Sequence, residues 1–214
     1  MFNVSATLNV SRLLYNPSLC LPHVTVKSFD QMIIPFKIPG HPEVQIKGVV
    51  VDKDNCFAKD HDDKVWPEYK DTWAKLQQTY PKERLLIVSN SAGTDDDTNY
   101  SQAERLEQNT GSTVLRHSVK KPGCLDEIKD YFAKQDVLAH EILIVGDRLF
   151  TDILMANMMG SWGLWLSDGV EQSQKVFPKM ERSLYYRLVT SRPEDPYVPP
   201  VPATPSSSNP PSNL

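Results

Sequence analysis

The chain has 214 residues, a formal net charge of −4, and 23 lysines and arginines that are dispersed along it. This length suits one α/β domain with extensions, and the dispersed positive charge argues against binding of nucleic acid over a broad basic face. The three cysteines have no CxxC spacing, which argues against a zinc site or a disulfide framework and favours a reducing compartment. No apolar run approaches the roughly 20 residues that a membrane-spanning helix needs.

Residues 1–40 are expected to form an N-terminal arm. The first 29 residues contain no acidic residue. This composition fits a targeting segment, an arm that packs on the domain, or an interfacial membrane anchor, and the three alternatives stay open. The anchor would use the apolar side chains of Phe2, Leu8, Val10, Leu13 and Leu14.

Residues 41–191 are expected to form the folded domain, in which apolar strands alternate with helical patterns. We expect strands at residues 44–51, 85–88, 114–116, 142–145 and 162–166. We expect helices at residues 68–79, 100–110, 126–134 and 151–159. This alternation predicts an α/β fold of the Rossmann-like type, a three-layer sandwich around a central parallel sheet. The absence of GxGxxG and GxxxxGK patterns argues against a dinucleotide-binding fold or a nucleotide-triphosphatase loop.

Residues 192–214 carry eight of the seventeen prolines, together with many serines. Such a composition buries too little apolar surface to offset the entropy of ordering the chain. We therefore expect a disordered tail.

Polar side chains follow the expected strands at the points where the strands end. In chain order they are Asp52 and Asp54, Ser89 and Asn90, Lys121, and Asp147 with Asp152. Because the carboxyl ends of parallel strands meet at one edge of a sheet, we expect these groups to converge.

This set of side chains suits phosphoryl transfer with one divalent metal ion. Mg²⁺ prefers oxygen ligands, which Asp52, the backbone carbonyl of Asp54, and Asp147 can supply. A carboxylate is a competent nucleophile towards phosphorus. Ser89 and Lys121 can neutralise the negative charge that spreads over the phosphoryl oxygens in the transition state.

The motif set resembles that of the haloacid dehalogenase-like (HAD) phosphatases of subclass IIIA. Their DxD motif matches residues 52–54, their second and third motifs match Ser89-Asn90 and Lys121, and their GDxxxTD motif matches residues 146–152. The resemblance implies that Asp52 is the nucleophile and a Mg²⁺ ligand, and that Asp54 is first the general acid and then the base. It also implies that Asp147 holds the metal and that Asp152 supports this arrangement.

A closer resemblance covers residues 7–170, on segments such as "VVVDKDNC", "LIVSNSAGT", "VLRHSVKKPGC" and "VGDRLFTDILMANMMGSWGLW". These segments are similar to the fungal mitochondrial phosphatidylglycerophosphate (PGP) phosphatases. The resemblance implies removal of the terminal phosphate of PGP to give phosphatidylglycerol, on the way to cardiolipin. It further implies a peripheral position on the matrix side of the inner mitochondrial membrane.

The spacing of the motifs predicts an open site. Only 36 residues separate Asp52 from Ser89, and 31 separate Ser89 from Lys121, which leaves no room for a cap domain of about 50 residues. An open site suits a head group presented by a membrane. It also suits a phosphoprotein or polynucleotide phosphatase, and a non-catalytic scaffold of this fold is a further alternative.

Other charged and aromatic residues lie near the motifs or in the expected strands. Near the catalytic edge, the basic residues are either head-group contacts or plain surface charge; they are Arg116, His117, Lys120 and Arg148. The acids at 61–64 and 94–97 are expected to be solvated loop residues. Trp162 and Trp165 are expected in the core.

Overall fold

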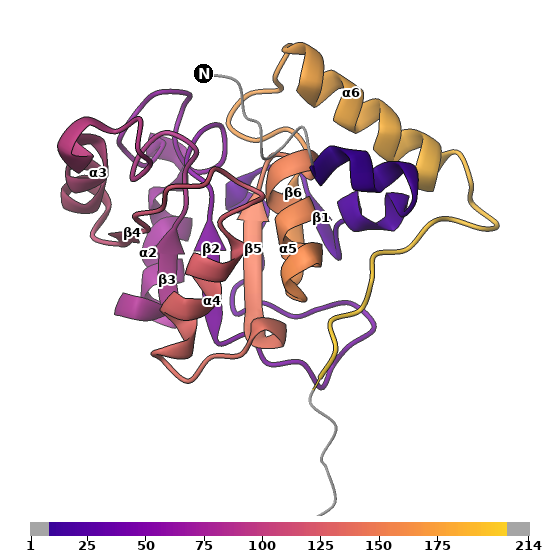
Figure 1. The fold of residues 1–214 in the computed structure, drawn as a ribbon, viewed down its shortest axis with the longest axis horizontal. Coiled ribbons are helices and arrows are strands. Elements are labelled where there is room, and N and C mark those ends of the chain that lie inside the picture. Colours follow the sequence, from indigo (N-terminus) through magenta and orange to yellow (C-terminus); the bar gives the residue numbers. More distant parts are fainter. Residues whose placement is uncertain (1–8, 205–214) are drawn as a thin grey trace, which may run out of the picture.

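A computed structural model describes residues 9–204 (Figure 1). Its centre is one parallel sheet of six strands in the order β1-β6-β5-β2-β3-β4. The strands are β1 (Val24–Val26), β2 (Gly48–Val51), β3 (Leu85–Ile87), β4 (Thr113–Val114), β5 (Ile142–Gly146) and β6 (Trp162–Leu166). The α/β fold with a central parallel sheet is therefore confirmed.

Helices cover both faces of the sheet. They are α2 (Lys70–Thr79), α3 (Ser101–Thr110), α4 (Leu125–Ala133), α5 (Leu154–Met159) and α6 (Val176–Tyr185). Alternate residues of each central strand point to opposite faces, as in β2. Val49 and Val51 pack in the core that contains side chains of α2 and α3, whereas Val50 packs in the core that contains side chains of α4 and α5. Both faces are buried, which explains the unbroken apolar runs in the sequence.

Some element bounds differ from the expected ones. β2 begins at Gly48 rather than at residue 44, because Gly48 pairs with Ile142, the first residue of β5, and residues 44–47 have no neighbouring strand to pair with. The helix expected from residue 151 begins as a π-helical turn at Leu149–Ile153 and continues as α5. π-helical turns occur frequently at functional sites.

The described part of the N-terminal arm packs on the domain. It contributes β1, which pairs with β6, and its side chains Cys20, Leu21 and Phe29 are buried. β1 has only three residues, too few for a periodic pattern to reveal it. Phe2 and Leu8, two of the residues proposed for a membrane anchor, lie outside the described residues.

The chain after β6 also differs from the expectation. α6 was not expected, and residues 192–204, expected to be disordered, form an extended segment that contacts the domain. The backbone N–H of Tyr197 donates to the carbonyl oxygen of Leu188 at 3.1 Å, and Nε2 of His23 lies 3.0 Å from the carbonyl oxygen of Pro200. The rest of the tail lies outside the described residues.

Candidate active site

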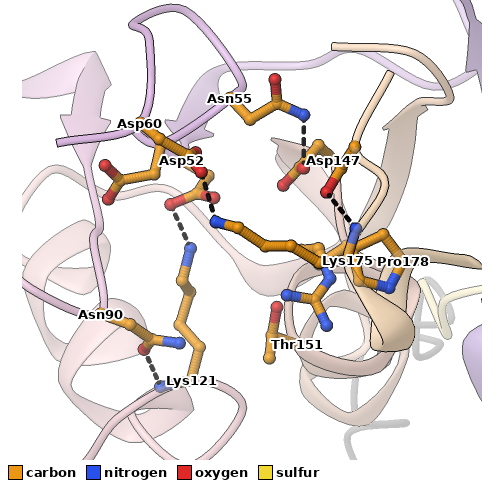
Figure 2. A pocket seen from close by; sticks show the side chains of 12 residues that line it. Asp52, Asn55, Asp60, Asn90, Lys121, Asp147, Thr151, Lys175 and Pro178 are labelled. Atoms are coloured by element: carbon orange, nitrogen blue, oxygen red, sulfur yellow. Dashed lines mark hydrogen bonds and ion pairs between the residues drawn. The ribbon is translucent and has the colours of Figure 1, made fainter. Parts of the chain in front are cut away.

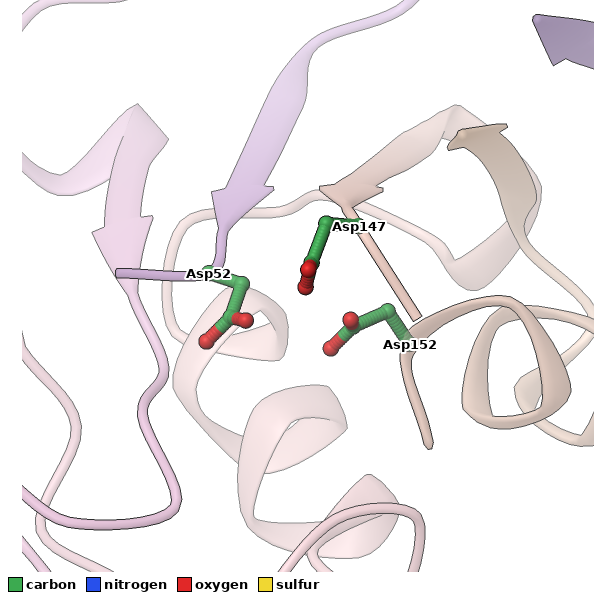
Figure 3. Close-up of side chains that lie close together, drawn as sticks. All are labelled: Asp52, Asp147 and Asp152. Atoms are coloured by element: carbon green, nitrogen blue, oxygen red, sulfur yellow. The ribbon is translucent and has the colours of Figure 1, made fainter. Parts of the chain in front are cut away.

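Three carboxylates converge at the carboxyl edge of the sheet. Asp52 follows β2, Asp147 follows β5, and Asp152 lies on the π-helical turn; one ligand oxygen from each lies within 4.8 Å of the others (Figure 3). The register of the sheet explains the convergence, since Val51 pairs with Val145 and the two strands therefore end side by side. Gly146 lets Asp152 approach, because a Cβ at this position would lie 2.4 Å from the Asp152 carboxyl carbon.

Lys121 is the cation among these carboxylates. Its side chain is 2% exposed, and its Nζ lies 2.5 Å from Oδ1 of Asp52 and 2.7 Å from Oδ1 of Asp152. Its backbone N–H donates to Oδ1 of Asn90 at 2.7 Å, which ties the loop of Lys121 to the end of β3 (Figure 2). Burial acts to lower the pKa of Lys121, but Asp152 and Asp52 raise it above its usual value, so the ammonium stays charged.

The three carboxylates carry more negative charge than Lys121 neutralises, so the site favours a second cation. Burial, opposed by Lys121 and assisted by Asp152 and Asp54, raises the pKa of Asp52 to about 7. Burial and the carboxylates of Asp52 and Asp152 also raise the pKa of Asp147 well above its usual value. Three carboxylates this close together beside one ammonium repel each other unless a cation or a proton relieves them. The donor set therefore fits a hard divalent metal ion, which prefers oxygen ligands.

Asp54 is held apart from this cluster by its own partners. Its Oδ1 accepts hydrogen bonds from Nζ of Lys53 at 2.7 Å and from the backbone N–H of His61 at 2.9 Å. Its Oδ2 lies 3.5 Å from Oγ of Ser89 and 3.3 Å from Oγ of Ser91. Burial acts to raise the pKa of Asp54, but the ammonium of Lys53 and these hydrogen bonds hold it below its usual value. Asp54 is therefore an ionised carboxylate in this arrangement.

A pocket of about 150 Å³ opens beside these groups (Figure 2). It is lined by Asp52, Asp54, Asn55, Asp60, Asn90, Lys121, Asp147, Arg148, Thr151, Ser173, Lys175 and Pro178. Within the described residues, only helical segments and loops lie between β2 and β3 and between β3 and β4, so no inserted cap domain is present there. The pocket can receive a phosphate group next to the carboxylate of Asp52 and the buried ammonium of Lys121.

Known proteins are similar to this chain over most of its length. The family described as mitochondrial PGP phosphatase matches residues 4–171. The chain belongs to the mitochondrial PGP phosphatase family. This confirms the family that the motifs indicated.

Two relatives match this chain over almost the whole of their own length. The mitochondrial phosphatidylglycerophosphatase GEP4 of Saccharomyces cerevisiae is 53% identical over 86% of this chain and 97% of its own. The probable mitochondrial phosphatidylglycerophosphatase of Schizosaccharomyces pombe is 33% identical over 93% of this chain and 97% of its own. A solved structure of an uncharacterized Listeria monocytogenes protein matches 64% of this chain and 98% of its own at 16% identity. Its TM-score of 0.42 is too low to bear on the fold or the function.

The four basic residues proposed as head-group contacts fall into two groups in this member of the family. Arg148 lines the pocket, where its guanidinium pairs with Glu181 at 2.9 and 3.0 Å. Arg116 pairs with Glu107, and Lys120 pairs with Asp96. These two residues, like the buried His117, are not among the residues that line the pocket.

His117 has contacts that hold two loops of the site together. Its Nε2 lies 3.0 Å from the carbonyl oxygen of Ser89, and its Nδ1 lies 2.8 Å from that of Val119. The imidazole thus joins the end of β3 to the loop that carries Lys121. Ser89 is fully buried, and its Oγ bonds with Ser91 and lies near Asp54 rather than lining the pocket.

One acid in the segment 94–97 is not a solvated loop residue. Asp97 is buried and accepts hydrogen bonds from the backbone N–H groups of Gly93, Gln102 and Ala103 at 2.8 to 2.9 Å. The expectation was wrong for this residue, because an acid placed just before a helix satisfies N–H groups that have no partner within the helix.

Several residues that shape the site were not identified from the sequence. Lys53 is buried beneath Asp54, and the Nδ2 of Asn55 donates to Oδ2 of Asp147 at 2.9 Å. Lys175 stands at the mouth of the pocket and pairs with Asp60 (Figure 2). Lys53 lies inside the DxD motif and Asn55 follows it, so their positions in the sequence could have identified them as site residues. Lys175 lies far along the chain from every motif, and no sequence pattern indicated it.

Proposed function

We propose that this protein hydrolyses the terminal phosphomonoester of PGP to give phosphatidylglycerol, a step towards cardiolipin. The observation that carries the proposal is the ion pair between buried Asp52, which follows β2, and Lys121. The chain that holds this pair belongs to the mitochondrial PGP phosphatase family. The names of the two yeast relatives give phosphatidylglycerophosphatase as their activity.

In the first half of the proposed reaction, the Asp52 carboxylate attacks the phosphorus atom and the bond to the alkoxide of phosphatidylglycerol breaks. The product of this half is an aspartyl-phosphate. Lys121, with Asn90 at the end of β3, stabilises the negative charge on the phosphoryl oxygens, while Ser89 supports this edge through its contacts with Ser91 and Asp54. Asp54 gives its proton to the leaving alkoxide.

In the second half, Asp54 takes a proton from a water molecule, and the water attacks the aspartyl-phosphate to release inorganic phosphate and restore Asp52. The lowered pKa of Asp54 keeps its carboxylate ionised, so that it can accept this proton. Its role as an acid requires that the arriving phosphate dianion raise the pKa of the carboxyl, because a nearby like charge favours the neutral form.

We propose Mg²⁺ as the cofactor, held by Asp52, Asp147 and the backbone carbonyl of Asp54. When bound, it neutralises charge on the phosphoryl group and on the carboxylates. Asp152 orients Lys121 and accepts a hydrogen bond from the backbone N–H of Arg148 at 3.1 Å, so we assign it a supporting role.

We propose that the reaction takes place on the matrix side of the inner mitochondrial membrane, with the protein bound peripherally. Both yeast relatives are named as mitochondrial. Among residues 9–204, no helix combines the length and the apolar character needed to cross a bilayer. We retain residues 1–40 as an arm that serves in targeting, packing or membrane contact, and residues 41–191 as the phosphatase domain.

The test compares substrates for the purified full-length protein in the presence of Mg²⁺. We expect phosphate release from PGP in mixed micelles to exceed release from phosphopeptides and from short phosphorylated oligonucleotides by at least about 10²-fold in kcat/KM, a difference of ~2.7 kcal/mol in transition-state stabilisation. Equal rates on all three classes would contradict a lipid substrate, and no release from any of them would favour a non-catalytic scaffold.

A further inference from the structure

Helix α6 places apolar side chains in solvent next to the mouth of the active-site pocket. Val176, Phe177 and Met180 are 70%, 58% and 52% exposed, although they lie on a helix that packs against the domain. At 100° per residue these three positions lie within about 100° of one another on the helix surface. They form one exposed apolar face, which we call the α6 face.

An adjoining side of α6 is anchored to the loop that carries Asp147 and Asp152. Glu181 is 1% exposed and accepts hydrogen bonds from the guanidinium of Arg148 and from the backbone N–H of Phe150. The ring of Tyr185 lies 5.0 Å from that of Trp165. Because one side is fixed in this way, the exposure of Val176, Phe177 and Met180 is a property of the folded domain and not of a loose helix.

The α6 face is continuous with the pocket. Ser173, Lys175 and Pro178 line the pocket, and Pro178 lies within α6 between Phe177 and Met180 in the sequence. Figure 1 shows α6 at the outer edge of the molecule, so the face is open to a partner. The carboxylates and Lys121 therefore lie in the pocket, the exposed Lys175 lies at its edge, and the apolar side chains of the α6 face lie beyond it.

The charge around this face contrasts with that of the whole chain. From Lys175 to Arg192 there are five basic residues and one acid, Glu181, which is buried, whereas the whole chain has a net charge of −4. Lys179 and Arg187 are exposed on the helix and on the π-helical turn that follows it (Tyr186–Thr190). Exposed apolar residues flanked by cations on a helix are typical of segments that bind the interface of an anionic bilayer.

We propose that the α6 face docks on an anionic lipid bilayer and holds the pocket at the level of the lipid head groups. The inference rests on the proposed function, since a phospholipid substrate keeps its acyl chains in the membrane while its phosphate enters the pocket. Val176, Phe177 and Met180 enter the boundary between head groups and acyl chains, and Lys179 and Arg187 contact lipid phosphates. Leu14 and Tyr15, which are also exposed, extend the apolar surface. Leu14 ends η1 (Ser11–Leu14) and Tyr15 follows it, and Leu13 of η1 packs in the same cluster as Leu184 and Tyr185 of α6.

The first experiment replaces two apolar residues of the face in the full-length protein, Phe177→Gln with Met180→Gln. The matched control is Ile33→Gln with Leu138→Gln, because Ile33 and Leu138 are 82% and 52% exposed, lie outside the pocket lining and are far from α6 in the sequence. Binding is measured by sedimentation with vesicles of phosphatidylcholine and phosphatidylglycerol. Turnover is measured on PGP in the same vesicles and on p-nitrophenyl phosphate in solution.

We expect the α6 variant to bind vesicles at least about tenfold more weakly and to lose turnover of vesicle PGP in proportion, because each apolar side chain contributes to interfacial partitioning. Its turnover of p-nitrophenyl phosphate and the behaviour of the control variant should match the wild type. Wild-type binding by the α6 variant, or an equal loss in the control, would overturn the proposal. A loss of soluble turnover would also overturn it, since α6 would then support the site itself, and a change of oligomeric state in light scattering would assign the face to a second copy of this chain.

The second experiment tests the charge around the face. Lys179→Gln with Arg187→Gln should weaken binding to vesicles that contain phosphatidylglycerol by about fivefold per residue and leave binding to pure phosphatidylcholine vesicles unchanged. The control is Lys70→Gln with Lys134→Gln, two exposed lysines of other helices. Equal effects of the two pairs would overturn the local charge argument. If wild-type protein binds vesicles through α6 yet releases no phosphate from PGP, the proposed substrate is wrong while the docking surface stands.

Discussion

Replacement of Lys121 by Met tests whether its ammonium is required both for the stability of the site and for its chemistry. The substitution keeps an unbranched side chain of similar length and removes the charge that lies 2.5 Å from Asp52 and 2.7 Å from Asp152. Breaking a buried ion pair by removing one partner costs about 3–5 kcal/mol, because an uncompensated charge stays buried. Here two carboxylates lose the same partner, so we expect the upper part of that range.

A loss of this size is a large share of the stability of a typical domain, which is about 5–15 kcal/mol. Added Mg²⁺ should recover part of it, because a cation that binds the carboxylates of the folded state stabilises that state. Urea unfolding with and without Mg²⁺ measures both effects. Lys120→Met is the control, since Lys120 is the neighbouring residue and pairs only with Asp96 near the surface.

Turnover of a soluble phosphomonoester by folded Lys121→Met protein should fall by about 10²–10⁴-fold, because a buried cation beside the phosphoryl group stabilises the transition state more than the ground state. The Lys120→Met control should stay within about threefold of the wild type. Turnover near the wild-type level in Lys121→Met, measured under conditions where the protein is folded, would refute a catalytic role for this residue. If Lys121→Met were as stable as the wild type, the substitution would not leave an uncompensated buried charge, and this part of the argument would be wrong.

The remaining predictions concern three aspartates and the metal ion. Asp52→Asn should lower turnover by about 10³-fold or more, measured as a single-turnover rate, because it removes the nucleophile and keeps its shape. Asp54→Asn should lower it by about 10²–10⁴-fold, with a smaller loss on a substrate whose leaving group needs no proton. Phosphate release should stop in excess chelator and return with Mg²⁺ but not with Ca²⁺, which takes more ligands in looser geometry; full activity in chelator would contradict a metal site. Burial acts to raise the pKa of Asp97, but its three backbone hydrogen bonds hold it below the usual 3.8. Its stabilisation is therefore present above the unfolded-state pKa and lost as pH falls through the folded-state pKa. Asp97→Asn should thus flatten the acid limb of the stability curve, whereas the exposed Asp95→Asn should not.

The sequence predicted the part of the fold and the site that depends on strand ends. Asp52 and Asp147 each follow an apolar run that is long enough to be read as a buried strand, and parallel strands fix where their ends meet. Lys121 comes after a strand of only two residues, but its place after the third expected strand and its match to the third motif led us to expect it at the same edge, where it contacts Asp52.

Other features could not be predicted, because their signal is spatial. β1 has three residues and pairs with a strand about 140 positions away, as the register of Val24 with Leu164 shows. α6 contains Pro178, and its buried Glu181 looks like a surface acid until Arg148 is placed beside it. The acid Asp97 looked solvated for the same reason, since its partners are backbone N–H groups rather than side chains.

The placement of charge relates the two halves of the proposed function. At the site the three clustered carboxylates outnumber the buried ammonium of Lys121, which favours a divalent cation and, with it, a phosphate group. From Lys175 to Arg192 the balance reverses, because this segment has five basic residues and one acid, Glu181, which is buried. A phospholipid with a terminal phosphate is drawn by the outer cations towards the mouth, but its phosphate is stable inside only when Lys121 and a metal ion offset the carboxylates. Salt should therefore weaken vesicle binding, which depends on exposed charge, far more than it lowers turnover of a soluble phosphomonoester, which depends on buried charge.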